Sequence, residues 1–221
     1  MGGFKHGNLN IDPGIYGEKI FTLLKQKKFE DFFNNVTGDN LNEYKIRIGG
    51  NLNLPKSKNQ FFHTDGEREP RMIVVNIATS DVNYSNGPME IYEKSHKTNY
   101  PYWKFHFINK FFMNKKKVIL NYGDILIREH RMWHRGTSNS SLISREMMGI
   151  MFMKNSSKMY FVQDNISNEV KLHTNIFQLT AKGRLKEILF LYFRPILFLY
   201  KCLISIKKKH QLFLIIYTIE R

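Results

Sequence analysis

A histidine and an aspartate stand two positions apart in the segment His63-Thr64-Asp65. In an extended strand, residues i and i+2 point to the same face, so these side chains can reach one metal ion together. A third ligand has to come from elsewhere, and His134 follows a predicted strand at 125–127 in a segment rich in donor groups. Two imidazoles and one carboxylate on one face of an octahedral ion leave its other face open, as in non-haem iron(II) centres that activate oxygen. An H-x-D pair also recurs by chance, so the pair alone does not establish such a site.

Arg145 is the second feature with chemical meaning. It follows His134 by eleven positions, across the turn-like segment GTSNSS, and it begins the apolar run at 146–153. An arginine at the start of that strand can face back into the cavity that holds the ligands, and its planar fork suits bidentate pairing with a carboxylate. A 2-oxoglutarate bound to iron through its keto-acid end would present its far carboxylate to such a group. Alone, Arg145 would be interpreted as a surface residue, and only the combination is informative.

Short strands are the elements expected to position these residues. Residues 15–35 carry apolar side chains at roughly helical spacing, which predicts one or two amphipathic helices. The segment 44–54 alternates and contains Gly49-Gly50, which predicts a strand followed by a turn. From residue 60 onward, short β-type runs separated by turns predict a sandwich or small barrel rather than βαβ units. These runs lie at 71–78, 89–92, 118–120, 125–127 and 146–153.

The last segment of the chain has a different character. Residues 184–206 are apolar except where Arg194, Pro195 and Lys201 interrupt them, and three lysines follow at 207–209. No uninterrupted piece reaches the roughly 20 apolar residues that span a bilayer, and Pro195 should kink or divide the helix. Two interpretations stay open: an interfacial amphipathic element, or helices packed on the barrel or on a second copy of the chain.

Composition and charge limit the class of protein. The 221 residues include 34 Lys and Arg against 19 Asp and Glu, a net charge of +15, and from Thr180 onward the numbers are nine and two. This balance favours anionic partners, although a lysine-rich composition explains it equally well, and no nucleic-acid-binding module supports a nucleic-acid partner. Cys202 is the single cysteine, which excludes an internal disulfide framework. We expect a cytoplasmic protein without a secretory signal, and peripheral contact with the inner face of the membrane through residues 185–221 stays open.

Three blocks of sequence resemble the phytanoyl-CoA dioxygenase family of Fe(II)/2-oxoglutarate oxygenases. They are QFFHTDG at 60–66, NGPMEIYEKSHK at 86–97 and YGDILIREHRMWHRGTSNSSLISR at 122–145, in the order that the family shows. The resemblance covers about residues 45–155. Glu93-Lys94 stand where the family usually has Pro-Gly, which alters a turn and no ligand. The segment before residue 40 is also short for the family, so a contact that is normally supplied there is in doubt.

The resemblance implies a double-stranded β-helix, or jelly-roll barrel. Together with the helical patterns on either side, we expect a mainly β fold with peripheral helices and a helical tail, divided into an oxygenase domain at 1–180 and a basic, apolar extension at 181–221. The resemblance further implies iron ligation by His63, Asp65 and His134, with Arg145 bound to 2-oxoglutarate. Gln60 and Asn76 would line the cosubstrate pocket.

The expected function is a dioxygenase that uses Fe(II), 2-oxoglutarate and O₂ to hydroxylate a C–H bond of a small or lipid-like molecule. The carboxylate of Asp65 favours hydroxylation, because related halogenases have a small residue there. The alternative is a non-catalytic jelly-roll metal-binding protein that docks on a membrane or anionic partner through its basic tail. The insertion at 97–117 is a candidate lid or substrate loop, with Tyr102, Trp103 and His106 as its candidate contacts. The substrate itself is not encoded in any recognisable motif.

Overall fold

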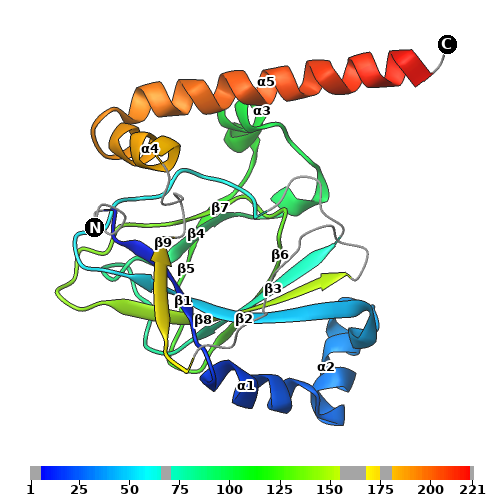
Figure 1. Cartoon of the computed structure of the whole chain (residues 1–221), viewed down its shortest axis with the longest axis vertical. Helices are drawn as coiled ribbons and strands as arrows, with labels where there is room; N and C mark the ends of the chain where they lie inside the picture. The colour runs from blue at the N-terminus through cyan, green and yellow to red at the C-terminus, as the bar shows by residue number, and fades with distance from the viewer. Residues whose placement is uncertain (1–5, 66–70, 155–167, 175–180, 220–221) are drawn as a thin grey trace.

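Two antiparallel sheets face each other in the computed structural model of the chain and form a jelly-roll barrel (Figure 1). The structure describes residues 6–65, 71–154, 168–174 and 181–219, and the side chains of the last helix as far as Ile206. The larger sheet has the strand order β6-β3-β8-β2-β1-β9 and the smaller one the order β5-β4-β7. The strands are β1 (Asn8–Asp12), β2 (Tyr44–Asn53), β3 (Met72–Ala78), β4 (Met89–Tyr92), β5 (Lys115–Val118), β6 (Ile125–Glu129), β7 (His134–Gly136), β8 (Arg145–Lys154) and β9 (Lys171–Thr174).

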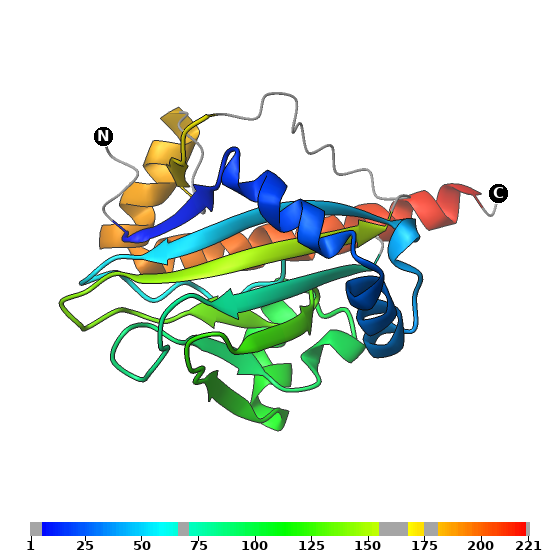
Figure 2. The same ribbon diagram turned by 90° about the horizontal axis from the view of Figure 1, so that it is seen from below.

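The two faces of the larger sheet have different roles. Side chains alternate across a strand, so Ile73 and Val75 of β3 point outward into the main apolar core, whereas Asn76 belongs to the opposite face. Two helices cover the outer face, α1 (Tyr16–Leu24) and α2 (Lys27–Thr37), as Figure 2 shows. Their apolar residues, among them Leu24 and Phe33, join the same core. The opposite face carries Asn76 next to smaller apolar clusters, one of which contains Met72, Val74 and Met153.

A second helical layer lies on the other side of the barrel from α1 and α2 (Figure 1). It consists of α3 (Tyr102–Phe107), α4 (Ala181–Tyr192) and α5 (Arg194–Ile219). Short 3₁₀ helices lie at Leu41–Glu43, Ser95–Lys97 and Asn109–Phe112. Pro195 is the second residue of α5, in the first turn, where a backbone N–H has no acceptor within the helix and none is lost. The proline cannot continue α4, so it divides the tail into two helices, as the sequence predicts. Within the described residues, no helix has the length and apolar character required to cross a membrane.

The expected fold class, mainly β with peripheral helices and a helical tail, is confirmed. Helices over 15–35 and strands near 71–78, 89–92, 125–127 and 146–153 are also found. The turn predicted at Gly49-Gly50 is wrong, because β2 continues through both glycines. A Cβ on Gly50 would lie 2.9 Å from the carbonyl oxygen of Met147, so the residue permits close approach of neighbouring strands rather than a turn.

Other strand boundaries differ from those expected. The strand predicted at 118–120 is instead β5 (Lys115–Val118), whose three lysines gave no apolar signal. Leu120 forms only an isolated bridge with Val82. Strands β1, β7 and β9 were not predicted, because each is short and makes its pairs with distant segments. The structure does not describe the side chains of residues 207–219, and the three lysines and the second apolar patch of the tail fall in this range.

Candidate metal centre

Backbone pairing brings the H-x-D segment to β7. His63 and His134 form an antiparallel bridge in which the N–H of each donates to the carbonyl oxygen of the other, at 2.9 and 3.0 Å. The N–H of Asp65 donates to the carbonyl oxygen of His130 at 2.9 Å, which continues the pairing. Because directly opposite residues of an antiparallel pair project to the same side, the two imidazoles lie together, with ring centroids 4.5 Å apart.

The neighbours of these residues anchor the opposite side of the same segments. Trp133 is fully buried and stacks on Phe105 at a centroid distance of 3.7 Å. The backbone N–H of Trp133 donates to the hydroxyl of Ser95 at 2.8 Å. Ser95, from the second sequence block, therefore holds the residue that precedes His134. Alternation along β7 then turns His134 to the inside.

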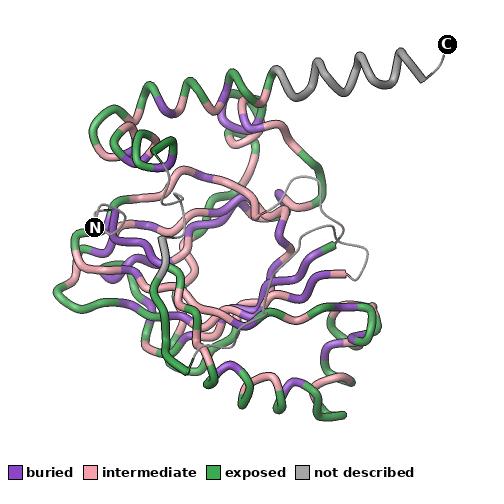
Figure 3. Tube along the Cα trace, in the orientation of Figure 1, coloured by how far each residue is buried: buried purple, intermediate pink, exposed green. Residues whose placement is uncertain are grey.

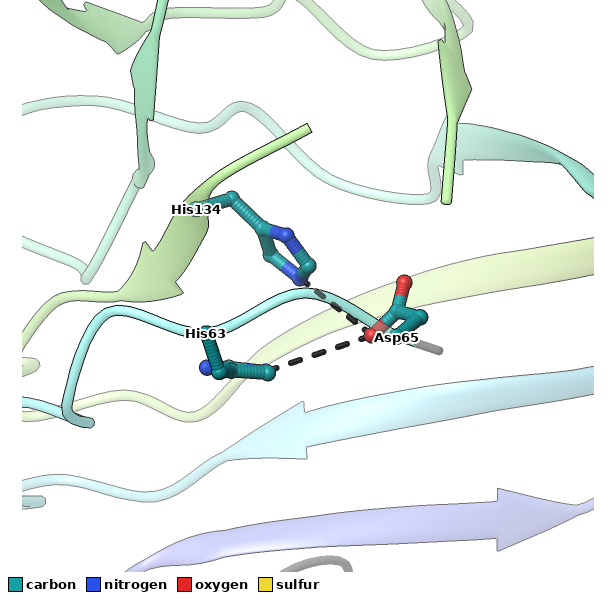
Figure 4. Close-up of side chains that lie close together, drawn as sticks. All are labelled: His63, Asp65 and His134. Carbon is teal, nitrogen blue, oxygen red and sulfur yellow. Dashed lines mark ion pairs between the residues drawn. The ribbon is translucent and has the colours of Figure 1, made fainter. Parts of the chain in front are cut away.

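Each histidine is oriented by a backbone carbonyl. The Nδ1 of His63 donates to the carbonyl oxygen of Phe61 at 2.8 Å, and the Nδ1 of His134 donates to that of Met132 at 2.9 Å. These bonds fix the tautomer in which Nε2 carries a lone pair, the form that ligates metals. The two Nε2 atoms lie 3.9 and 3.5 Å from Oδ1 of Asp65 (Figure 4). All three donor atoms are within 4.8 Å of one another.

This donor set fits a divalent transition-metal ion. Neighbouring ligand atoms in an octahedral shell with bonds of about 2.1 Å lie about 3 Å apart. A small inward movement of the three side chains would therefore bring their donor atoms to bonding distance from one ion. His134 is buried, whereas the side chains of His63 and Asp65 are 36% and 28% exposed, which leaves the open side of the triad accessible. Among the described residues, no other group of three His, Cys, Asp or Glu side chains lies close enough together to hold a metal ion.

Arg128 is a functional residue that the sequence reasoning missed. Its Nη1 pairs with Oδ2 of Asp65 at 2.6 Å, and its side chain is only 6% exposed. The Nε of Arg128 donates to Oδ1 of Asn76 at 3.3 Å, so Asn76 supports the metal centre through the arginine. Because Arg128 occupies Oδ2, Oδ1 is the oxygen left for the metal. Alternation in β6 was the available signal, since it places Arg128 on the face opposite to Ile127, which packs on the outer core.

Charges and burial set the protonation states of the triad. Burial would raise the pKa of Asp65, but the positive charge of Arg128, together with His134, holds it well below its usual range. Burial, with a smaller effect of His134, lowers the pKa of His63 to about 4. At neutral pH the site therefore has an ionised carboxylate and a neutral imidazole at His63, the forms in which these groups bind metals.

Arg145 is held at the start of β8. Its Nη1 donates to Oδ1 of Asn51 at 2.6 Å and its Nη2 donates to the carbonyl oxygen of Gly87 at 3.0 Å. Gly87 has a φ of +83°, and a Cβ there would lie 2.1 Å from Nδ2 of Asn53, so only glycine allows this approach. Arg145 is 4% exposed, and within the described part of the chain no carboxylate pairs with it and its Nε has no hydrogen-bond partner. Burial lowers its pKa to about 10, so the group stays charged at neutral pH.

A buried cation without a counterion is costly unless a ligand neutralises it. The distal carboxylate of 2-oxoglutarate is negatively charged and planar, so it would suit the guanidinium of Arg145 as a counterion. Gln60, also predicted near the cosubstrate, has a local backbone role, since its Oε1 accepts a hydrogen bond from the N–H of Gly136 at 2.9 Å. This bond fixes the end of β7 two residues after His134.

The candidate lid residues lie in a packed layer. Tyr102 and His106 are each 7% exposed, and their rings contact each other at 4.3 Å in a cluster with Trp133. The N–H of Trp103 donates to Oγ of Ser205 in α5 at 3.1 Å. The aromatic part of the insertion is therefore clamped between the barrel and α5, and a role in substrate contact stays a prediction.

The fold and the site together define a class: a jelly-roll barrel with two histidines and one carboxylate on its inner face. A family model described as phytanoyl-CoA dioxygenase (PhyH) matches residues 22–147, more than half of the chain. The chain belongs to the phytanoyl-CoA dioxygenase family. The match ends before α4 and α5 begin.

Solved structures agree on the fold. The epimerase SnoN, in complex with Fe³⁺, alpha ketoglutarate and nogalamycin RO, has a TM-score of 0.57 at 16% identity, over 73% of this chain and 71% of that chain. EctD from S. alaskensis with bound Fe has a TM-score of 0.54 at 13% identity, over 68% and 58%. EvdO2 from Micromonospora carbonacea var. aurantiaca, complexed with 2-oxoglutarate, has a TM-score of 0.51 at 12% identity, over 68% of each chain. No curated protein sequence matches the chain significantly.

Proposed function

We propose that the chain is an Fe(II)- and 2-oxoglutarate-dependent dioxygenase that hydroxylates a C–H bond of a small-molecule or lipid-like substrate. The observation that carries the proposal is the convergence of three donor atoms within 4.8 Å on the inner face of the barrel, with their Nδ1–H groups and Oδ2 already engaged. Similar folds bind iron or 2-oxoglutarate in the solved structures of SnoN, EctD and EvdO2. Family membership and the buried, unneutralised Arg145 support 2-oxoglutarate as the cosubstrate.

The chain's own residues have separate tasks in this proposal. His63, Asp65 and His134 hold the metal and leave its other positions open, Arg128 orients Asp65, and Arg145 binds the far carboxylate of the cosubstrate. When bound, the iron with 2-oxoglutarate and O₂ supplies the oxidising power for C–H attack. The protein contributes the coordination geometry. This complete set of groups favours an enzyme over a non-catalytic metal-binding jelly roll.

The test uses the purified full-length chain with Fe(II), 2-oxoglutarate and O₂, and with ascorbate as the reductant that replaces the unidentified substrate. We expect bound iron near one equivalent per chain, and formation of succinate above the level without protein. His63→Ala and His134→Ala should lose both iron and succinate formation. A wild-type protein that binds neither iron nor 2-oxoglutarate would contradict the proposal, and one that binds both without forming succinate would favour the non-catalytic alternative.

A specific observation also favours contact with a membrane surface. Large apolar residues recur at helical spacing along α5 and are 38–60% exposed: Ile196, Leu199, Tyr200, Leu203 and Ile206. Exposed positions therefore alternate with buried ones along the described part of this helix (Figure 3). A surface helix normally has a polar outer face, and this one is apolar on both sides. The segment from Thr180 onward has seven more basic than acidic residues, which opposes pairing of two copies and favours an anionic bilayer. We propose peripheral binding of α5 to such a surface.

A further inference from the structure

Helix α5 lies beyond the residues that match the family, yet it packs against the segments that carry His63 and His134. The residues on its inner side include Leu197 and Cys202, which are 2% and 5% exposed. Cys202 belongs to the aromatic cluster that contains Phe62, the residue next to His63. The bond from Trp103 to Ser205 fixes the same helix to α3. The C-terminal extension is therefore in a position to add side chains to the site.

Lys201 of α5 lies over the segment that leads to His63. Its Nζ lies 5.1 Å from the ring centroid of Phe61 and 5.5 Å from that of Tyr102. Phe61 is also the residue whose carbonyl oxygen holds Nδ1 of His63.

Arg194 brings a second positive charge to the same place. Its guanidinium carbon lies 4.7 Å from the ring centroid of Phe61 and 4.3 Å from that of Phe190. One of its nitrogens donates to the carbonyl oxygen of Asn59 at 2.8 Å, in the loop that leads from β2 to His63. Arg194 and Lys201 thus stand over the same ring, on the side of the barrel where the ligating segment runs.

Neither cation has an acidic partner in the part of the chain that the structure describes. Burial lowers the pKa of Lys201, and Lys186 and Arg194 lower it further, so its surroundings are positive rather than negative. Contacts with aromatic faces compensate a cation only in part. Two partly buried cations beside a metal site therefore lack an anion.

We propose that Lys201 and Arg194 bind the anionic group of the substrate, a carboxylate or phosphate, whose apolar body contacts Phe61 and neighbouring aromatic rings. The proposal deepens the dioxygenase function and rests on it. It makes the C-terminal extension a determinant of specificity, because the family's own matched segment ends at residue 147 and supplies neither cation. An uncharged analogue of the same length should bind poorly.

The experiment measures binding rather than turnover. Decanoate, decyl phosphate and decan-1-ol are titrated calorimetrically into the full-length chain loaded with Fe(II) and 2-oxoglutarate without oxygen. We expect both anions to bind at least about ten-fold more tightly than the alcohol, with the tighter anion showing which headgroup is preferred. Lys201→Met should remove about ten-fold of anion affinity and leave alcohol binding unchanged.

Two further variants keep the result interpretable. Lys201→Arg retains the charge and should retain most of the anion preference, which separates charge from packing if the methionine variant folds poorly. Lys117→Met is the matched control, because Lys117 also lies over an aromatic ring, Tyr84 at 5.7 Å, and should change nothing. Equal binding of anions and alcohol, or equal affinities for the Met variant and wild type, would overturn the proposal. The same titration without metal gives an answer even if the chain binds no iron, so failure of the dioxygenase function is seen separately.

Discussion

Replacing Asp65 by asparagine should affect two properties that can be measured apart. The amide is nearly isosteric, but it removes the charge that pairs with Arg128 at 2.6 Å and replaces an anionic metal donor with a neutral, weaker one. Arg128, whose side chain is 6% exposed, would then be a nearly buried cation without its counterion. We therefore expect Asp65→Asn to lose metal affinity and also to lower the free energy of unfolding of the metal-free protein.

The size of the stability loss follows from the burial of the pair. Removing one partner of a fully buried ion pair costs about 3–5 kcal/mol. Asp65 is 28% exposed, so water screens part of the effect, and about 2 kcal/mol is the expected loss. For a chain of this length, that loss corresponds to a decrease in melting temperature of about 4–8 °C.

A double variant separates the two effects. In Asp65→Asn with Arg128→Met, no charge is left unpaired, so most of the lost stability should return while metal affinity does not. Unfolding is measured in urea with EDTA present, so that bound metal does not contribute, and metal affinity is measured by titration with Fe(II). Asp12→Asn, at an exposed turn aspartate, is the control and should change neither property. Unaltered metal affinity in Asp65→Asn, or a double variant as unstable as the single one, would refute this reasoning.

Three other predictions concern separate parts of the molecule. Arg145→Met should weaken 2-oxoglutarate binding about ten- to hundred-fold with little change in iron affinity, measured by calorimetry with and without metal. Asp39 accepts a hydrogen bond from Tyr44 at 2.5 Å, and that bond, together with Lys154 and Arg71, lowers its pKa although burial opposes the shift. The ionised Asp39 thus stabilises the fold above about pH 4, and this stabilisation is lost as pH falls through the lowered pKa. Asp39→Asn should therefore lower the free energy of unfolding in urea by about 1–2 kcal/mol at neutral pH, and by progressively less below pH 4. Finally, the double substitution of Leu199 and Leu203 by Glu should abolish co-sedimentation with anionic vesicles. Leu142→Glu, at a residue that is 92% exposed on a barrel loop, is the control and should not affect it. Equal binding of the two variants would exclude α5 as the contact.

Strand geometry suggested the first two ligands of the triad, and the resemblance to the family supplied the third. His63 and Asp65 are two residues apart, so their shared face follows from strand geometry alone, and the structure places both beside His134. The spacing from His134 to Arg145 places the arginine at the start of β8, where it is buried. Each of these inferences needed a short segment and one strand periodicity.

Other residues depended on contacts that no local pattern encodes. Arg128 gains its role from Asp65, which is 63 positions away, and its strand resembled an ordinary apolar run. Gly49-Gly50 was assigned to a turn because glycine is common there, but here it allows β2 to pair closely on both sides. Lys201 interrupted an apolar segment and gave no hint that α5 would dock near Phe61. Tertiary packing decided all three.

The charges around the centre connect these observations. Arg128 neutralises Asp65, and the imidazole of His63 is neutral at pH 7, so the protein itself offers little net negative charge to a divalent ion. The dianionic cosubstrate would balance the metal, after which Arg145 still adds one positive charge. Lys201 and Arg194 add two more within reach of Phe61. A site with this excess favours ligands that arrive with negative charge, so iron should be held more tightly once 2-oxoglutarate is present, and the cations of α5 are left to select an anionic substrate.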